Sequence, residues 1–251
     1  MNYWEVLFYG VYSDLRTEIA RRFLGFLWWI IEPVMYMAVF YIVFGMALRQ
    51  GGADYVPFLL SGMIAWKWFD GSVRQASVSI PLNSGLIQQI FVPKFLFGLI
   101  QIFSNSFKFL IVFTLFLAFI LFTGKQPSVE WFGLLPVMLV QLLLIIAVGL
   151  FLASIIPFAQ DLKLVVDNVL MLMMFMSGIF FSADQVPESM REVFEYNPMV
   201  LLISAYRDVL LHNQWPQWSA LGYCIALAVP VLIAALIVLR RNERHYAKLL
   251  Y

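Results

Sequence analysis

"FLFGLIQIFSNSFKFLIVFTLFLAFILF", residues 95–122, is the stretch that decides the fold of this chain. Lys108 is its single charged side chain, and about 20 apolar residues suffice for a helix to cross the hydrocarbon of a bilayer. The apolar residues run continuously and do not alternate with polar ones, which favours a helix over a strand of a membrane barrel. The stretch therefore predicts a transmembrane helix.

The rest of the chain has the same character. Of its 251 residues, 63% are hydrophobic and 12% are charged, whereas a soluble domain has about a quarter of its residues charged. We expect an all-α integral membrane protein with a single membrane domain, 1–251. Its six transmembrane helices are expected at 23–48, 56–80, 95–122, 131–158, 164–182 and 219–239. Lysine and arginine are commoner in the segments that would lie inside, so both termini are expected in the cytoplasm.

Three segments are not predicted to cross the membrane. Residues 3–22 place apolar and polar side chains on opposite faces, which predicts an amphipathic helix on the inner membrane surface, serving as an anchor or as a docking surface. Residues 83–94 predict a short helix or a loop before the third crossing. Residues 186–213 hold two prolines suited to helix starts. The second of these helices is too short to span and too apolar for water, so we expect a re-entrant hairpin from the outer face, with a surface helix on the bundle as the alternative.

Charged side chains stand inside the expected second crossing. Lys67, Asp70 and Arg74 share one helical face, and Asp70 can pair with both cations. A charge near the bilayer centre costs about 2.5–3.5 kcal/mol on insertion scales, so these groups must face protein or water. The third crossing carries a matching polar stripe that includes Asn105 and Lys108. The two faces indicate a wetted pathway, and a structural brace explains the charges equally well.

Aromatic side chains accompany these charges. The first crossing carries Trp29, Tyr36 and Phe40 along one stripe, and the second adds Trp66 and Phe69. A wall of rings beside polar groups suits the flat C–H faces and the hydroxyls of a carbohydrate chain. The alternative is that the rings face lipid or pack the bundle.

The sequence lacks the chemistry of an enzyme. It contains no G-x-x-x-x-G-K-[ST] phosphate loop, so ATP hydrolysis by that route must occur on another chain. His212 and His245 fall on opposite sides of the expected membrane, and no cluster has the spacing of metal ligands. We therefore expect no catalytic residue, no metal site and no cofactor in this chain.

Five segments carry a family resemblance: "RTEIARRFLGFLWWIIEP" at 16–33, "FLLSGMIAWKWF" at 58–69, "NSGLIQQIFVPKF" at 83–95, "SGIFFSADQVPESMR" at 177–191 and "YNPMVLLISAYRDVLL" at 196–211. In this order they resemble the membrane (permease) subunit of ABC-type exporters of polysaccharide and polyol phosphate. Such exporters move lipid-linked O-antigen, capsule or teichoic acid across the bacterial inner membrane. The resemblance implies a homodimer with two ABC-type ATPase subunits, which bind the ATP and Mg²⁺. Separately, the net charge of +1 gives no hint of a nucleic-acid partner.

The resemblance also implies roles for particular residues. The substrate pathway would be lined by Trp29, Tyr36, Phe40, Trp66, Lys67, Phe69, Asp70, Arg74, Asn105 and Lys108. Arg21 and Arg22 would attract the pyrophosphate of the lipid-linked substrate, or would be simple positive-inside anchors. Coupling to the ATPase would use Asp14, Glu18, Gly85, Leu86, Ile87, Gln88, Gln89 and Phe91. The outer re-entrant helices would carry Glu188, Arg191, Asn197, Pro198, Tyr206 and Arg207.

The function expected from these observations is the permease half of an ATP-driven exporter of lipid-linked polysaccharide. An ABC exporter permease for a small lipid or drug is one alternative. An ion-coupled secondary transporter that uses Asp70 and Lys67 is another, although the sequence shows no internal symmetry of the kind that such transporters have. A lipid-modifying enzyme is a third, and the scarcity of catalytic groups disfavours it.

Overall fold

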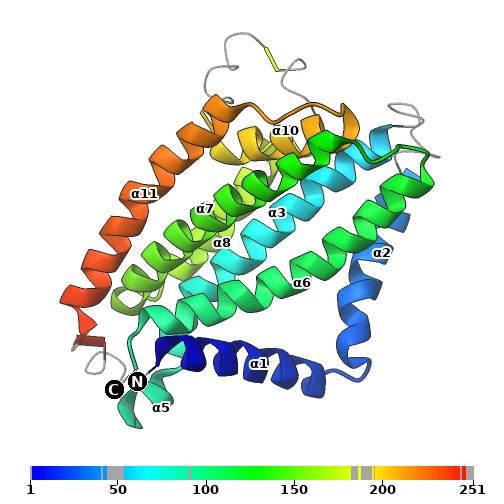
Figure 1. Cartoon of the computed structure of the whole chain (residues 1–251). Coiled ribbons are helices and arrows are strands. Elements are labelled where there is room, and N and C mark those ends of the chain that lie inside the picture. Colours follow the sequence, from blue (N-terminus) through cyan, green and yellow to red (C-terminus); the bar gives the residue numbers. More distant parts are fainter. Residues whose placement is uncertain are drawn as a thin grey trace.

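The computed structural model describes residues 2–40, 42–43, 54–89, 92–181, 186–187, 194, 196–243 and 245–246. Every regular element in these residues is a helix, which confirms the expected all-α class for the described part of the chain. The longest helices run side by side, and two helices, α1 and α10, lie across opposite ends of the bundle (Figure 1).

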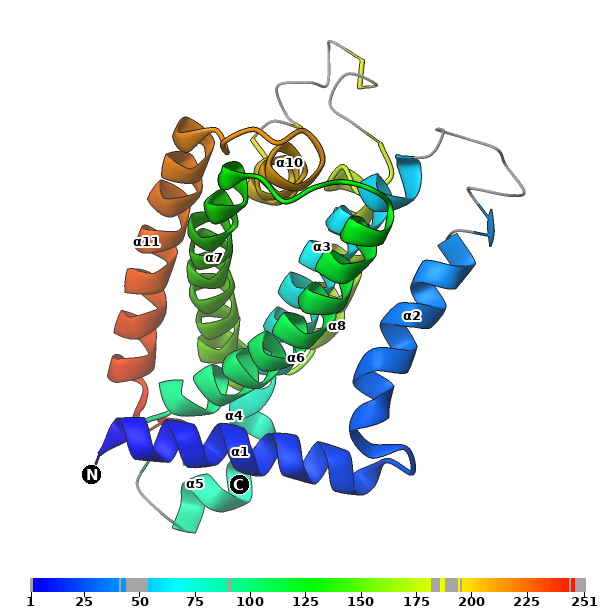
Figure 2. The ribbon, with the colours of Figure 1, turned by 45° about the vertical axis from the view of Figure 1, so that its right-hand side comes forward.

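The bundle is built on four helices: α3 (Tyr55–Ser77), α6 (Phe95–Phe122), α7 (Leu134–Ile155) and α11 (Trp218–Arg241). α3 packs against both α6 and α7, and α11 packs along α7. Their apolar side chains form one core that continues into α10. α8 (Leu162–Met176) packs on α3, and α2 (Trp28–Phe40) stands at the edge of the bundle (Figure 2).

Three helical stretches are long and apolar enough to cross a membrane: Phe95–Phe122, Val129–Phe158 and Trp218–Arg241. They coincide with the crossings expected at 95–122, 131–158 and 219–239. The middle stretch consists of α7 and a 3₁₀ turn at each of its ends.

The other three expected crossings are shorter or more polar in the described residues. α2 and α8 are too short there, and residues 41, 44–53 and 182–185, in or beside the ends of these two crossings, lie outside the described residues. α3 is long enough but carries Lys67, Asp70 and Arg74. Most of its surface is covered by other helices, so packing within the protein accounts for its stability rather than contact with lipid.

The N-terminal helix α1 (Tyr3–Arg21) confirms the helix expected at 3–22. The Asn2 side chain caps it by accepting a hydrogen bond from the Trp4 N–H. α1 lies along the lower part of α6 (Figure 2). Gly10 allows this approach, because a Cβ there would meet the Ile100 side chain at 2.4 Å. The outer face of α1 exposes aromatic side chains, among them Trp4 and Phe8.

A short helix also forms in the segment expected at 83–94. α3 is followed by α4 (Ser79–Leu82) and then by α5 (Ser84–Gln89), which lies at the same end of the bundle as α1 (Figure 2). Ile87 anchors α5 in a second apolar cluster with residues of α6, α7 and α11, whereas its neighbours along α5 are exposed. α5 thus presents a small, mostly exposed surface at the α1 end.

α10 (Pro198–Leu211) covers the other end of the bundle. Asn197 caps it by accepting a hydrogen bond from the Met199 N–H, and Pro198 occupies its first turn, as the sequence predicts. Most of its side chains are buried against α3, α7 and α11. The first of the two short helices expected at 186–213 falls mainly on residues 188–193 and 195, which lie outside the described residues.

Candidate functional site

A cavity of about 300 Å³ opens between α1, α2, α3 and α6. It brings together many of the side chains that the sequence analysis assigns to a substrate pathway: Trp29, Tyr36, Lys67, Asp70, Asn105 and Lys108. Glu18 and Arg22, to which the sequence analysis gives other roles, line it as well. The side chain of Phe40, also expected in the pathway, lies outside the described residues.

Glu18 is the centre of the polar contacts at this cavity. Its Oε2 atom accepts a hydrogen bond from Lys108 Nζ at 2.9 Å, and its Oε1 atom lies 3.1 Å from Arg22 Nη2. Trp29 Nε1 donates to the same Oε1 atom at 3.4 Å. One carboxylate therefore holds donors from the residue after α1, from α2 and from α6 at a single junction.

These donors set the pKa of Glu18. Partial burial raises the pKa of the carboxyl, but the hydrogen bond from Lys108 and its charge, helped by Trp29 and Arg22, outweigh burial and hold the pKa below its usual value. Glu18 is therefore ionised at neutral pH. It serves as the counter-ion of Lys108.

Other polar side chains of α6 also form hydrogen bonds with α1 and α3. Gln101 Nε2 donates to Asp14 Oδ1 at 3.0 Å, and Asn105 Nδ2 donates to Gln75 Oε1 at 2.7 Å. Asp14 and Glu18, expected to contact an ATPase, thus bond to α6 in this structure. The sequence pattern identifies the polar face of α1, but it does not reveal that this face meets another polar helix.

Lys67 and Asp70 line the cavity without forming an ion pair. Asp70 accepts from Arg74 Nε at 2.8 Å, one helical turn further on. Lys67 instead extends toward α2, with its Nζ atom 4.8 Å from the centre of the Tyr36 ring. Among the described residues, no carboxylate lies within 4.0 Å of Lys67. Of the two cations with which the sequence allows Asp70 to pair, this structure pairs it with Arg74.

Arg74 lies apart from the cavity and joins α3 to α8. It pairs with Asp167 through Nη1, and its Nη2 atom donates to the Asp167 carbonyl at 3.2 Å. The sequence analysis did not use Asp167. A signal was available, because Asp167 is the single charged residue between 164 and 182, and a lone charge in an apolar stretch requires a partner.

Two aromatic side chains expected in the pathway lie elsewhere. Trp66 and Phe69 are 2% and 4% exposed and pack in the main core, away from the cavity. Trp68 lines the cavity in their place, stacks on Phe109 with ring centres 4.0 Å apart and donates to Ser106 Oγ at 3.1 Å. Since α3 is covered on most sides, its helical period alone does not identify which face borders the cavity.

The residues expected to contact an ATPase from 83–94 lie mostly on the surface. Gly85, Leu86, Gln88 and Gln89 are exposed on α5, and Ile87 is buried. Phe91 lies outside the described residues. Of the two arginines expected to attract pyrophosphate, Arg22 lines the cavity, whereas Arg21 is exposed at the end of α1 and does not line it.

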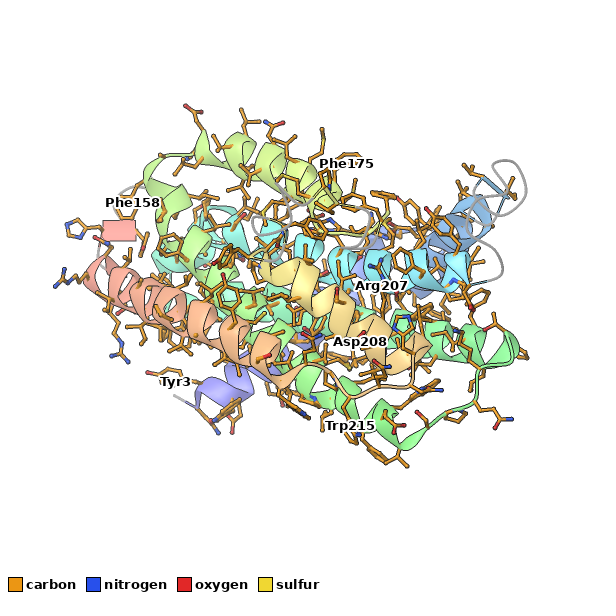
Figure 3. The ribbon with its side chains drawn as sticks, turned by 90° about the horizontal axis from the view of Figure 1, so that it is seen from above. Tyr3, Phe158, Phe175, Arg207, Asp208 and Trp215 are labelled. Carbon is orange, nitrogen blue, oxygen red and sulfur yellow. The ribbon has the colours of Figure 1, made fainter. Side chains whose placement is uncertain are left out.

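The opposite end of the bundle holds a buried cation. Arg207 points from α10 toward α3 (Figure 3) and is 5% exposed. Its guanidinium donates to the carbonyls of Gly178 at 2.8 Å, Ile179 at 3.0 Å and Phe58 at 3.2 and 3.3 Å. It also lies 3.4 Å from the centre of the Phe58 ring. This arrangement ties α10 to the start of α3 and to the turn after α8.

The other residues expected in the outer helices have structural contacts or fall outside the description. Tyr206 is buried in the core of the bundle, and Asn197 and Pro198 start α10. Glu188 and Arg191 lie outside the described residues. In the described part of the chain, no group of three or more His, Cys, Asp or Glu side chains has the geometry of a metal site.

Comparisons with a family model and with individual known proteins agree with one another. The model of the ABC-2 type transporter family matches residues 7–211. The chain is 23% identical over 239 residues to the O-antigen export system permease protein RfbA of Klebsiella pneumoniae and 26% identical over 242 residues to that of Myxococcus xanthus. Each alignment covers 95% of this chain and 92% of the relative. The polysialic acid transport protein KpsM of Escherichia coli is 23% identical, with 92% and 90% covered.

Proposed function

Because the chain belongs to the ABC-2 type transporter family, we propose that it is the membrane subunit of an ATP-driven exporter of lipid-linked polysaccharide. One observation carries this proposal. The relatives named as O-antigen export permeases align over 95% of this chain and 92% of their own length, so the likeness extends over the whole membrane domain. The chain is a transporter permease subunit and contributes no ATP-hydrolysing site of the phosphate-loop type.

ATP hydrolysis would take place on two partner subunits bound at the α1 end. α5 supports this placement, because Gly85, Leu86, Gln88 and Gln89 are exposed there while Ile87 fixes the helix to the bundle. A push on α5 would pass to α6 and α7 through the apolar cluster around Ile87. Asp14 and Glu18 would take part indirectly, by holding α1 to α6.

In the membrane, the chain would make six crossings with both termini in the cytoplasm. α1 would lie at the inner surface with Trp4 and Phe8 in the headgroup layer, where aromatic rings are favourable. α10 would form the deeper part of a re-entrant hairpin on the outer side. Its apolar side chains support a position within the outer end of the bundle, since they are buried against α3, α7 and α11.

The glycan would pass between two copies of this chain. The cavity of one copy, at about 300 Å³, is at the small end of the range for small-molecule sites and is too small for a polymer. It has room for the headgroup of a lipid carrier. Arg21 and Arg22 would attract its pyrophosphate, and the aromatic and polar side chains around Lys67 would meet the first sugars.

The test is deletion of the chain's gene from its host, followed by analysis of the lipid-linked glycans on each side of the inner membrane. We expect a glycan-lipid to accumulate on the cytoplasmic side, and the intact gene to reverse this. Re-expression with a partner ATPase that binds but does not hydrolyse ATP should fail to restore export. An unchanged envelope would contradict the proposal. Transport by the purified chain without ATPase, abolished by an uncoupler, would indicate an ion-coupled transporter instead.

A further inference from the structure

The charges around the cavity are unevenly paired. Glu18 is shared by Lys108 and Arg22, so two cations have one carboxylate between them. Lys67 lines the same cavity with no carboxylate within 4.0 Å in the described residues. Asp70 and Glu32 line it as well; Asp70 is held by Arg74, and Glu32 is exposed on α2. The cavity as a whole is lined by as many carboxylates as cations, but Glu18 itself is contacted by two cations and by the Trp29 N–H.

We propose that Glu18 is an internal counter-ion in an anion site, and that a phosphate or diphosphate group of the substrate lipid replaces it at Lys108 and Arg22. This inference rests on the proposed function, which supplies the lipid-linked substrate. A phosphate group offers more acceptor oxygens than a carboxylate to the donors gathered here. Arg22 is 43% exposed, so the pair with Glu18 can open without unpacking the core.

The shape of the cavity fits such a group. About 300 Å³ accommodates a headgroup, and the apolar side chains of Leu60, Met63 and Val112 line the wall beside the polar junction. A lipid chain attached to the headgroup would therefore meet an apolar surface. The site combines one polar end with one apolar wall, as sites for amphipathic ligands do.

Replacement of Glu18 has a mechanical consequence. Two polar contacts between side chains fasten α1 to α6 in the described residues: Glu18 with Lys108, and Asp14 with Gln101. Glu18 also holds the junction of α1 with α2 through Trp29. A ligand that takes Lys108 from Glu18 would loosen the C-terminal half of α1. Binding of substrate would thus change how α1 is held at the end of the bundle where α5 lies (Figure 2).

The binding test uses the permease with its ATPase partner in phosphatidylcholine nanodiscs. Two probes are titrated separately, a polyprenyl diphosphate in the bilayer and inorganic diphosphate in solution. Glu18→Gln should tighten binding roughly three- to tenfold, because it removes the competing charge and leaves the cations in place. Lys108→Met should weaken it by a similar factor. Glu5→Gln is the matched control on the same helix, since Glu5 is exposed and contacts Asn2, and it should leave affinity unchanged.

Tightening by Glu18→Gln in either arm supports the anion site, and the arm in which it occurs tells a lipid headgroup from a free phosphate. Unchanged or weaker binding in both arms overturns the inference, because a mere brace between α1 and α6 would not compete with an anion. If the deletion still traps glycan-lipid in the cytoplasm in that case, the proposed function stands and the counter-ion role alone fails.

A second measurement needs no variant. In the wild-type complex, deuterium uptake of residues 14–21 should rise when the bound probe displaces Glu18, while uptake of the core helix α7 should stay constant. Equal or slower uptake in residues 14–21 would overturn the release of α1, even if Glu18→Gln failed to fold.

Discussion

Arg207 at the α10 end and Lys108 at the cavity are both cations among apolar helices, but their surroundings differ. Arg207 is 5% exposed, and three backbone carbonyls from two other segments accept its hydrogen bonds. Lys108 pairs with one carboxylate beside an open cavity. Carbonyls at helix ends cannot move away without unpacking the core. The Glu18 carboxylate, on a side chain that is 23% exposed beside the cavity, can rotate aside.

The difference distinguishes a cation that is fixed in the structure from a cation whose anionic partner can be exchanged. A guanidinium that satisfies fixed carbonyls has no vacant place for a ligand, and its loss leaves buried acceptors unpaired. A lysine whose partner can leave has a place for another anion. Burial and partner type together therefore distinguish Lys108, whose partner can move away, from Arg207, whose partners are fixed backbone carbonyls. The predictions that follow test this comparison.

The largest effect is expected from Arg207→Ala. The substitution leaves the carbonyls of Phe58, Gly178 and Ile179 without these donors, which should lower the free energy of unfolding by about 3 kcal/mol or more. We expect a much lower midpoint of thermal unfolding in detergent and a poor yield of folded protein. Arg240→Ala, at an exposed position near the end of α11, is the control and should change little.

Arg207→Lys sharpens the same test. Lysine keeps the charge but lacks the planar fork that reaches several carbonyls at once, so it should restore only part of the lost stability. A stable Arg207→Ala protein that has lost affinity for diphosphate would reverse the comparison, since Arg207 would then bind ligand.

A pair of glycines on α3 gives the next largest effect. A Cβ at Gly62 would lie 2.9 Å from Arg207 Nη2 and 3.3 Å from the Ile179 backbone, whereas one at Gly71, beside the cavity, would meet nothing closer than Asn105 Oδ1 at 3.9 Å. Gly62→Ala should destabilise by about 1–3 kcal/mol through overpacking. Gly71→Ala should be neutral or stabilise by up to about 1 kcal/mol, since alanine favours a helix interior.

Thermal unfolding of the two alanine variants measures this contrast. Equal loss of stability at both glycines would show that the cavity is as tightly packed as the Arg207 site, and would remove the physical basis for an exchangeable partner.

The ion pair between Arg74 and Asp167 is an intermediate case. It joins α3 to α8 with both side chains about one-third exposed, at 31% and 37%. A double-mutant cycle with Arg74→Met and Asp167→Asn should give a coupling free energy of about 1 kcal/mol. Strictly additive effects would mean that α8 is held by its apolar contacts alone. A coupling as large as the loss from Arg207→Ala would mean that exposure does not distinguish the two kinds of cation.

The sequence predicted the positions of helices better than it predicted the contacts between them. The helices at 95–122 and after Asn197 were expected correctly, because continuous apolar runs and proline–asparagine caps act locally. Likewise, the helical period shows that Lys67 and Asp70 share a face of α3. It does not show that Asp70 turns to Arg74 while Lys67 reaches Tyr36, because that depends on where α2 stands.

The candidate site shows the same limit. Lys108 and Asn105 were expected on one polar stripe, but the counter-ion Glu18 was assigned to a surface contact with an ATPase. An amphipathic helix has a polar face whichever surface it meets, so α1 on its own could not reveal that this face packs on α6. Trp66 and Phe69 illustrate the reverse, since aromatic rings next to charges were expected at the cavity and lie in the core.

The smallest expected effect is the pH dependence of stability, which should differ between Glu18 at the cavity and Arg207 at the α10 end. The pKa of Glu18 is held below its usual value of 4.5 in the folded protein, mainly by Lys108 against the opposing effect of burial. A group whose pKa falls on folding stabilises the protein above the unfolded value and loses that contribution as the pH falls through the folded value. The free energy of unfolding of wild type should exceed that of Glu18→Gln by at most about 1 kcal/mol at pH 7. The difference should vanish as the pH is lowered well below 4.5.

The measurement is the difference in thermal unfolding midpoint between wild type and Glu18→Gln from pH 7 down to pH 3, with Glu5→Gln as control at each pH. A difference that grows on acidification would contradict the assignment, since protonation of Glu18 can only remove its attraction for Lys108. In the described residues Arg207 donates its hydrogen bonds to carbonyls and not to a carboxylate, and the neighbouring Asp208 adds only a charge attraction, so most of the loss from Arg207→Ala should persist over this range. A cavity cation that depends on its carboxylate and a core cation that does not would then be distinguished in one titration.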